Sequence, residues 1–186
     1  EIANSKSIHK MAQDLISNEV KMSHFLLVNK AAWIGPEVEW HQEVFNLQIY
    51  APGCDAKKEW KNFLQVFIAL DKHDKINGCL KVLQGSHRVG RIGHGVSDTP
   101  EQTADMERIR ELEKRHKSVY IESEPGDALF FHANLLHSSD ANKSNESRRA
   151  LIVCFNTKSN NPYKESGHSS YTPLKVSSSK DIMEYN

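Results

Sequence analysis

The segment PGDALFFHANLLHSSDANKSNESRRA, residues 125–150, says more about the fold than any other part of the chain. It begins with a Pro-Gly-Asp turn that leads into a short apolar strand, and we expect the next strand to begin at about Arg148. Between these two strands lies His137, whose imidazole is a common metal ligand. Short strands joined by tight turns predict a strand-rich barrel or sandwich.

Segments of the same character lie on both sides of this stretch. Turn-forming pairs such as Gly-Pro, Pro-Gly and Asn-Gly separate them. The expected strands cover residues 24–29, 43–50, 63–70, 79–83, 119–122, 128–132 and 150–156. A helical stripe near the start of the chain is formed by Ile8, Met11, Ala12, Leu15 and Ile16. The sequence therefore predicts a mainly β fold with a helix packed against it.

One insertion, residues 99–117, has the pattern of a second helix. Thr99 is a capping residue, Pro100 suits the first helical position, and a charged stretch follows. The apolar positions Met106, Ile109 and Leu112 form only a narrow stripe. The charge favours a solvated surface helix, and the alternative is a lid over a site.

Composition limits the organisation and the partners of the chain. A length of 186 residues with 38% hydrophobic residues supports one core, so we expect a single domain, 1–186, and the start at Glu1 leaves room for an N-terminal part. The net charge of zero argues against nucleic-acid and membrane partners. Three widely spaced cysteines (Cys54, Cys79 and Cys154) suit reduced thiols, and a cytoplasmic location is expected because the sequence has no signal peptide or apolar span.

A candidate metal motif is formed by His41 and Glu43. In a strand, residues i and i+2 point to the same face, so this imidazole and this carboxylate would converge. Two histidines and one carboxylate are the ligand set of many non-haem iron(II) enzymes. With ten histidines and 24 acidic residues, the motif alone is unspecific. The third ligand would be His137 or its rival His132.

Three segments taken together are more specific. WHQE (40–43), FIALDKHDKINGCLKVLQGSH (67–87) and GDALFFHANLLHSSDANKSNESRRA (126–150) resemble the phytanoyl-CoA dioxygenase family, which includes ectoine and amino-acid hydroxylases. The similarity runs from about residue 26 to about residue 156, with the motifs in the family's order. The resemblance implies a double-stranded β-helix, the jelly-roll or cupin-like fold, with flanking α-helices. It also implies iron(II) held by His41, Glu43 and His137.

The resemblance further implies a 2-oxoglutarate site. Arg148 would bind the distal carboxylate, Ser139 would assist it, and Phe67 would line the pocket. Because adjacent strand residues face opposite sides, only one of Arg148 and Arg149 can point inward. The implied activity is hydroxylation of a small-molecule substrate by O2 and 2-oxoglutarate, with release of succinate and CO2.

The main departure from the family pattern is Glu43, where the family usually has Asp. The carboxylate argues against halogenation, but the extra methylene raises the alternative of a catalytically impaired jelly-roll binding protein. A second rival is a cupin-like enzyme that uses another metal without a keto acid and has no use for Arg148. The segment FNTKSNNPYKESGHSSYTPL (155–174) is similar to the tail of certain amino-acid hydroxylases. It favours a small, polar, amino-acid-like substrate.

Overall fold

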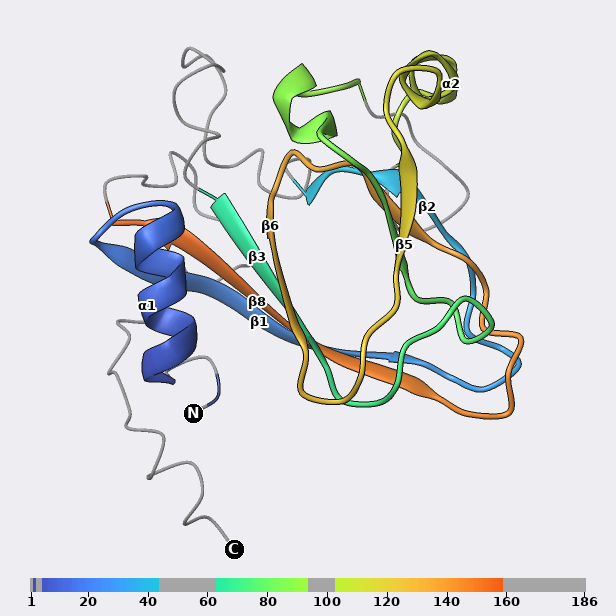
Figure 1. Ribbon diagram of the computed structural model, residues 1–186, viewed down its shortest axis with the longest axis horizontal. Coiled ribbons are helices and arrows are strands. Elements are labelled where there is room, and N and C mark those ends of the chain that lie inside the picture. The colour runs from blue at the N-terminus through green and yellow to red at the C-terminus, as the bar shows by residue number, and fades with distance from the viewer. Residues whose placement is uncertain (1, 3–4, 44–62, 94–102, 159–186) are drawn as a thin grey trace, which may run out of the picture.

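The computed structural model describes residues 2, 5–43, 63–93 and 103–158 (Figure 1). Strands dominate this part of the chain, and the helices are short. In chain order the elements are α1 (Lys6–Leu15), β1 (Val20–Lys30), β2 (Val38–His41), β3 (Phe63–Ala69), β4 (Leu80–Leu83), the 3-10 helix η5 (Ser86–Val89), α2 (Met106–Glu113), β5 (Ser118–Ile121), β6 (Ala128–His132), β7 (His137–Ser139) and β8 (Arg148–Thr157). The predicted mainly β class is confirmed.

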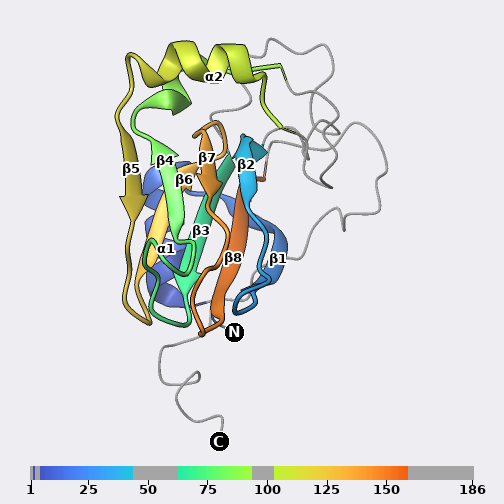
Figure 2. The ribbon, with the colours of Figure 1, turned by 90° about the vertical axis from the view of Figure 1, so that its right-hand side faces the viewer.

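The strands form two antiparallel sheets of four. The first has the order β1-β8-β3-β6, and the second has the order β2-β7-β4-β5. The two sheets face each other across the molecule in Figure 1, and the second sheet faces the viewer in Figure 2. Because strands distant in the sequence are neighbours in both sheets, each sheet can bring residues from several segments to one interior surface.

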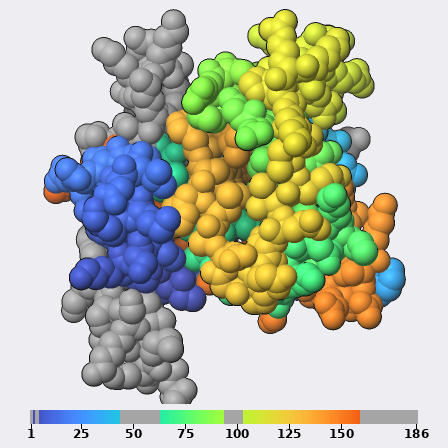
Figure 3. All heavy atoms as spheres, in the orientation of Figure 1, coloured from blue at the N-terminus to red at the C-terminus, as the bar shows by residue number. Residues whose placement is uncertain are grey.

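The first sheet is buried on both faces at its centre. Every residue of β3 is buried, so this strand separates two apolar layers. Its outer layer packs against α1, which forms a ridge along one side of the molecule in Figure 3. The fully or nearly buried members of this layer are Ala12, Leu64, Val66, Ile68, Leu151, Val153 and Phe155. The predicted N-terminal helix is confirmed, although Met11 and Leu15 of its apolar stripe are exposed.

The second helix is shorter than the sequence suggested. α2 begins at Met106 with Asp105 as its cap, whose side chain accepts hydrogen bonds from two backbone N–H groups. The predicted start at residues 99–102 lies outside the described residues, and residues 103–105 are not helical. Ile109 is completely buried in a cluster with Trp40 and Leu136. One side of this charged helix is therefore part of the core.

Strand boundaries differ from prediction mainly around the second sheet. β6 has the predicted limits, whereas β7 has only three residues and was not predicted. The segment 43–50 was expected to be a strand, but the strand there, β2, ends at His41 and residues 44–50 lie outside the described residues. Cys79 and Cys154 are free and buried. None of the described helices has the length and apolar character needed to cross a membrane.

Candidate metal centre and cosubstrate pocket

The pairing of β2 with β7 brings two predicted ligands together. His41, the last residue of β2, lies opposite His137, the first residue of β7. Their ring centroids are 4.1 Å apart. His137 is buried, and the Leu136 N–H that precedes it is bonded to the buried Ser86 hydroxyl at 2.9 Å. The short strand therefore holds His137 firmly at the edge of the cavity.

Both imidazoles are oriented by the same kind of hydrogen bond. His41 Nδ1 donates to the Glu39 carbonyl at 2.7 Å, and His137 Nδ1 donates to the Leu135 carbonyl at 2.9 Å. A hydrogen bond at one ring nitrogen fixes the tautomer and leaves the other nitrogen as the acceptor. In its neutral form each ring would therefore present an unprotonated Nε2, the form that binds a metal.

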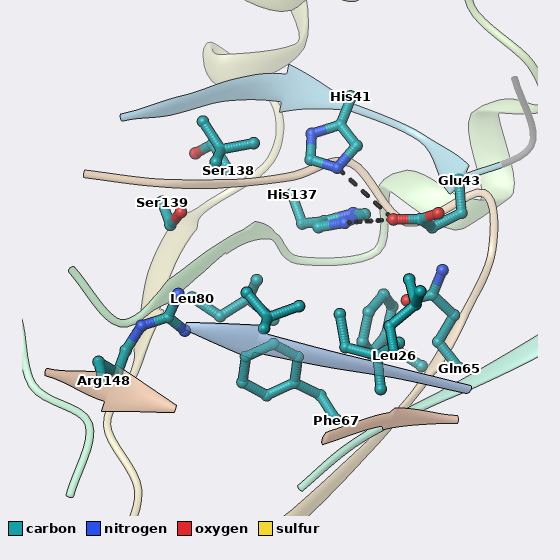
Figure 4. A pocket seen from close by; sticks show the side chains of 14 residues that line it. Leu26, His41, Glu43, Gln65, Phe67, Leu80, His137, Ser138, Ser139 and Arg148 are labelled. Carbon is teal, nitrogen blue, oxygen red and sulfur yellow. Dashed lines mark ion pairs between the residues drawn. The ribbon is translucent and has the colours of Figure 1, made fainter. Parts of the chain in front are cut away.

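Glu43 completes the cluster from the segment after β2. Its Oε1 lies 3.6 Å from His41 Nε2 and 3.4 Å from His137 Nε2. The chain has left the strand at this point, since β2 ends at His41. The simple strand geometry used in the sequence argument therefore does not apply to Glu43. Its extra methylene nevertheless allows the carboxylate to reach both imidazoles, as Figure 4 shows.

The charges in the cluster suit a cation. Burial by itself raises the pKa of Glu43, but the interactions with His137 and His41 outweigh it and hold this pKa well below its usual range. Burial also lowers the pKa of His137, and His41 adds to this effect. The Glu43 carboxylate is therefore ionised at neutral pH. The three candidate ligand atoms lie within 4.8 Å of one another, the arrangement of three ligands around a single metal ion.

Arg148 lies at the other end of the same pocket. It is 3% exposed, and within the described part of the chain its Nε and Nη1 atoms have no hydrogen-bond partner. Its guanidinium carbon lies 5.6 Å from the centroid of the Phe67 ring. Burial lowers the pKa of Arg148 to about 10, so the side chain stays charged at neutral pH. A buried cation of this kind needs an anion.

Ser139 stands near this end of the pocket and is held by a residue that the sequence argument missed. The Nζ of the buried Lys30 donates to Ser139 Oγ at 2.8 Å and to the Asp140 carbonyl at 2.6 Å. Lys30 is also the strand partner of Arg148 across β1 and β8. The hydroxyl of Ser139 therefore accepts from Lys30 and keeps its own proton to donate to an anion.

These side chains line a single cavity between the two sheets. Its volume is about 230 Å³. The lining consists of Leu26, Val28, Val38, His41, Glu43, Gln65, Phe67, Leu80, Phe131, His137, Ser138, Ser139, Arg148 and Ile152. Figure 4 shows the metal cluster on one wall and Arg148 near one end, with Gln65 and Leu26 toward the other end. All six predicted site residues lie in this cavity lining.

The rivals considered in the sequence lie elsewhere. His132 Nδ1 accepts a hydrogen bond from the Asn134 N–H at 3.0 Å, and His132 is not part of the cavity lining. Arg149 points away from the cavity and pairs with Asp71, with Nη2 and Oδ1 2.7 Å apart. Strand alternation thus separates the two neighbouring arginines into one inward and one outward side chain.

Gln42 is a second residue that the sequence argument missed. Its side chain donates to the carbonyls of Gly90 and Asn134 at 2.9 and 2.7 Å, and accepts from the Ile92 N–H at 2.9 Å. These bonds tie the end of β2 to two other segments. They fix the backbone between the two ligands His41 and Glu43. Its position between two candidate ligands was the available signal.

The fold and this cavity define a jelly-roll protein with a candidate metal centre. The family model described as phytanoyl-CoA dioxygenase matches residues 2–150, so the chain belongs to the phytanoyl-CoA dioxygenase family. A probable phytanoyl-CoA dioxygenase of Caenorhabditis elegans is 29% identical over 149 residues, which is 76% of this chain and 45% of that protein. The ectoine dioxygenase of Sphingopyxis alaskensis is 28% identical over 171 residues, or 86% and 54% of the two chains. This chain spans about half the length of these curated relatives.

Solved structures confirm the fold. The crystal structure of EctD from S. alaskensis with 2-oxoglutarate and 5-hydroxyectoine has a TM-score of 0.76 and 23% identity, and covers 95% of this chain and 62% of its own. The structure of the same protein with bound Fe also has a TM-score of 0.76, with 24% identity. At this level of identity the likeness establishes the jelly-roll architecture, which confirms the predicted fold.

Proposed function

We propose that this protein is an iron(II)- and 2-oxoglutarate-dependent dioxygenase that hydroxylates a small organic substrate. The observation that carries the proposal is the buried Arg148, whose Nε and Nη1 lack partners in the described residues, in the same cavity as the cluster of His41, Glu43 and His137. A metal enzyme without a keto acid has no use for this charge. The two relatives described above are both named as dioxygenases, which agrees with the proposal.

The donor set fits iron(II). Two imidazoles and one ionised carboxylate give a 2-His-1-carboxylate set, which leaves positions open for a chelating keto acid and for oxygen. His41 and His137 would bind through Nε2, since each Nδ1 is held by a carbonyl. Iron(II), 2-oxoglutarate and O2 together supply the oxidising power for C–H hydroxylation, with succinate and CO2 as coproducts.

The residues at the other end fit the distal carboxylate of 2-oxoglutarate. Arg148 offers free N–H groups in a planar fork that can bind a carboxylate through two bonds. Ser139 offers a hydroxyl whose oxygen already accepts from Lys30, so its proton is available to the carboxylate. Phe67 packs against the guanidinium and shields it from water. Each of these groups orients the cosubstrate without taking part in a proton transfer.

The substrate is proposed to be small and polar, such as an amino-acid-like metabolite. The cavity of about 230 Å³ lies below the range of roughly 300–1,000 Å³ that is usual for drug-sized ligands, and it must also hold the cosubstrate. The relatives include a 2-aminoethylphosphonate dioxygenase, 31% identical over 98 residues, whose name also denotes a small polar substrate.

The proposal is tested by release of CO2 from carboxyl-labelled 2-oxoglutarate in the presence of iron(II) and O2. The wild-type protein should release CO2, and His137→Ala should abolish the release because it removes a metal ligand. His132→Ala is the matched control, since His132 lies outside the cavity lining, and it should retain release. Undiminished, iron-dependent release by His137→Ala would contradict the assignment.

A further inference from the structure

Gln65 is a polar residue of the cavity lining that has no function in the mechanism above. Gln65 lies in the middle of β3, the strand that is buried throughout. It is 2% exposed and lines the cavity with Glu43 and Leu26. No hydrogen bond joins its amide to another described residue, and the amide faces the cavity, since it is not among the fully enclosed polar groups that lack a partner. Because this amide joins no two segments of the described chain, it does not hold the fold together as buried amides usually do, and structural stability does not account for glutamine at this position.

Gln42 provides a direct comparison within the same molecule. It is also buried, but its amide makes three hydrogen bonds to backbone groups of other segments. Gln42 therefore serves the structure, as buried amides usually do. Gln65 has the same side chain and the same degree of burial, and its hydrogen-bonding groups face a cavity instead of a protein partner.

The position of Gln65 separates it from the cosubstrate end of the cavity. Gln65 pairs with Cys154 across β3 and β8, whereas Arg148 is the first residue of β8. Along β8, Cys154 and Arg148 are six residues apart, which corresponds to roughly 20 Å of strand. Figure 4 shows Gln65 beside Leu26 on the Glu43 side of the pocket, away from Arg148. A keto acid anchored on Arg148 and reaching the metal cluster leaves the Gln65 end for another molecule.

We infer that the Gln65 amide binds the substrate, and that the substrate presents to it a neutral polar group such as a carboxamide, a lactam or a hydroxyl. An amide both donates and accepts, so it matches a group that does the same. It has no charge, so an ionised group buried against it would lack a counter-charge. This inference rests on the proposed function, because it assigns the part of the cavity that 2-oxoglutarate does not fill.

The first part of the test is the stability of two matched variants of the full chain. Gln65→Met keeps the unbranched shape and removes the amide, and it should melt at the same temperature as the wild type or higher. Gln42→Met makes the same chemical change and should melt at a clearly lower temperature, since it leaves three backbone groups without partners. Equal destabilisation by both variants would overturn the inference, because Gln65 would then have a structural role.

The second part measures ligand binding at Gln65. The full chain, loaded with zinc(II) in place of iron(II) and with 2-oxoglutarate, is titrated with butyramide or with pentan-2-one, which have similar size. The side-chain amide resonance of Gln65 is identified by its loss in Gln65→Met and followed by NMR. Butyramide should shift this resonance and bind about tenfold more tightly than the ketone, the factor expected for one to two neutral hydrogen bonds. Gln65→Met should remove this preference.

Equal affinity for the two probes, or no shift of the Gln65 resonance by butyramide, would overturn the inference. The proposed function is monitored in the same samples by the binding of 2-oxoglutarate. If the wild-type protein did not bind 2-oxoglutarate, the proposed function itself would be refuted. Normal 2-oxoglutarate binding without a response at Gln65 would reject the substrate assignment alone.

Discussion

Replacing Arg148 with methionine should change stability and cosubstrate affinity in opposite directions. The guanidinium is buried and its Nε and Nη1 are unpaired in the described residues, so its removal should stabilise the ligand-free protein by about 1 to 2 kcal/mol. Two charge-assisted hydrogen bonds to 2-oxoglutarate are lost at the same time. That loss should cost about 3 to 4 kcal/mol of binding free energy, which weakens binding about 100- to 1,000-fold.

The assay is urea unfolding of the protein with and without 2-oxoglutarate in the presence of the metal. A concentration about 100 times the dissociation constant should stabilise the wild type by about 2.7 kcal/mol, and should leave Arg148→Met almost unchanged. Arg149→Met is the matched control, since this neighbour points outward and pairs with Asp71, and it should retain wild-type affinity. If Arg148→Met destabilised the ligand-free protein and kept its affinity, the arginine would be a structural residue and the reasoning would be wrong.

Three further predictions concern the scaffold. Ile109→Ala should lower the free energy of unfolding by about 2 to 4 kcal/mol in urea titrations because the side chain is fully buried. The control Met106→Ala, on the exposed side of α2, should have little effect. Small effects of equal size in both variants would instead support a loosely attached lid. Ser86→Ala should cost about 1 to 3 kcal/mol, measured in the same way, since it leaves the buried Leu136 N–H without its acceptor; wild-type stability would show that this bond is replaceable. Burial raises the pKa of Cys79 to about 11, so roughly one thiol in a thousand is ionised at pH 8. After treatment of the native protein with an alkylating reagent, mass spectrometry should find Cys79 unmodified. Rapid alkylation of Cys79 would contradict its burial.

The sequence predicted the strands whose apolar pattern is uninterrupted. β6 has the predicted limits, and β3 differs from its prediction by one residue. β1 was expected to begin at His24 but begins at Val20, and its first two buried positions are the polar residues Lys21 and Ser23, which an apolar run cannot reveal. β7 has three residues, too few for a periodic signal, and it is defined by its partners β2 and β4.

Candidate site residues that belong to a sequence motif were predicted. Residues that reach the site only through the folded arrangement of distant segments were missed. His41, Glu43 and His137 were expected from motif and spacing, and the structure brings all three together. Lys30 was missed because its contact with Ser139 joins β1 of one sheet to β7 of the other, which the sequence alone does not bring together. Gln65 left a visible trace, a polar residue within the apolar run FLQVFIAL. Its meaning required the knowledge that the whole strand is buried and that this side chain faces a cavity.

The substitution of Glu43 for the usual aspartate is also clarified by the structure. From the sequence, the longer side chain raised the alternative of a catalytically impaired protein. In the folded protein the segment after β2 leaves the strand, and the carboxylate lies 3.4 and 3.6 Å from the two imidazole nitrogens. The extra methylene therefore does not prevent the three groups from meeting at one point.

The most direct test of the central claim is an anaerobic titration of the protein with iron(II) and 2-oxoglutarate, followed by visible absorption. The proposed site predicts a weak charge-transfer band that requires both components. This band should disappear in His137→Ala, which lacks a metal ligand, and should need much more 2-oxoglutarate in Arg148→Met. A folded wild-type protein that gives no band with saturating iron(II) and 2-oxoglutarate would contradict the claim that these residues form one metal and cosubstrate site.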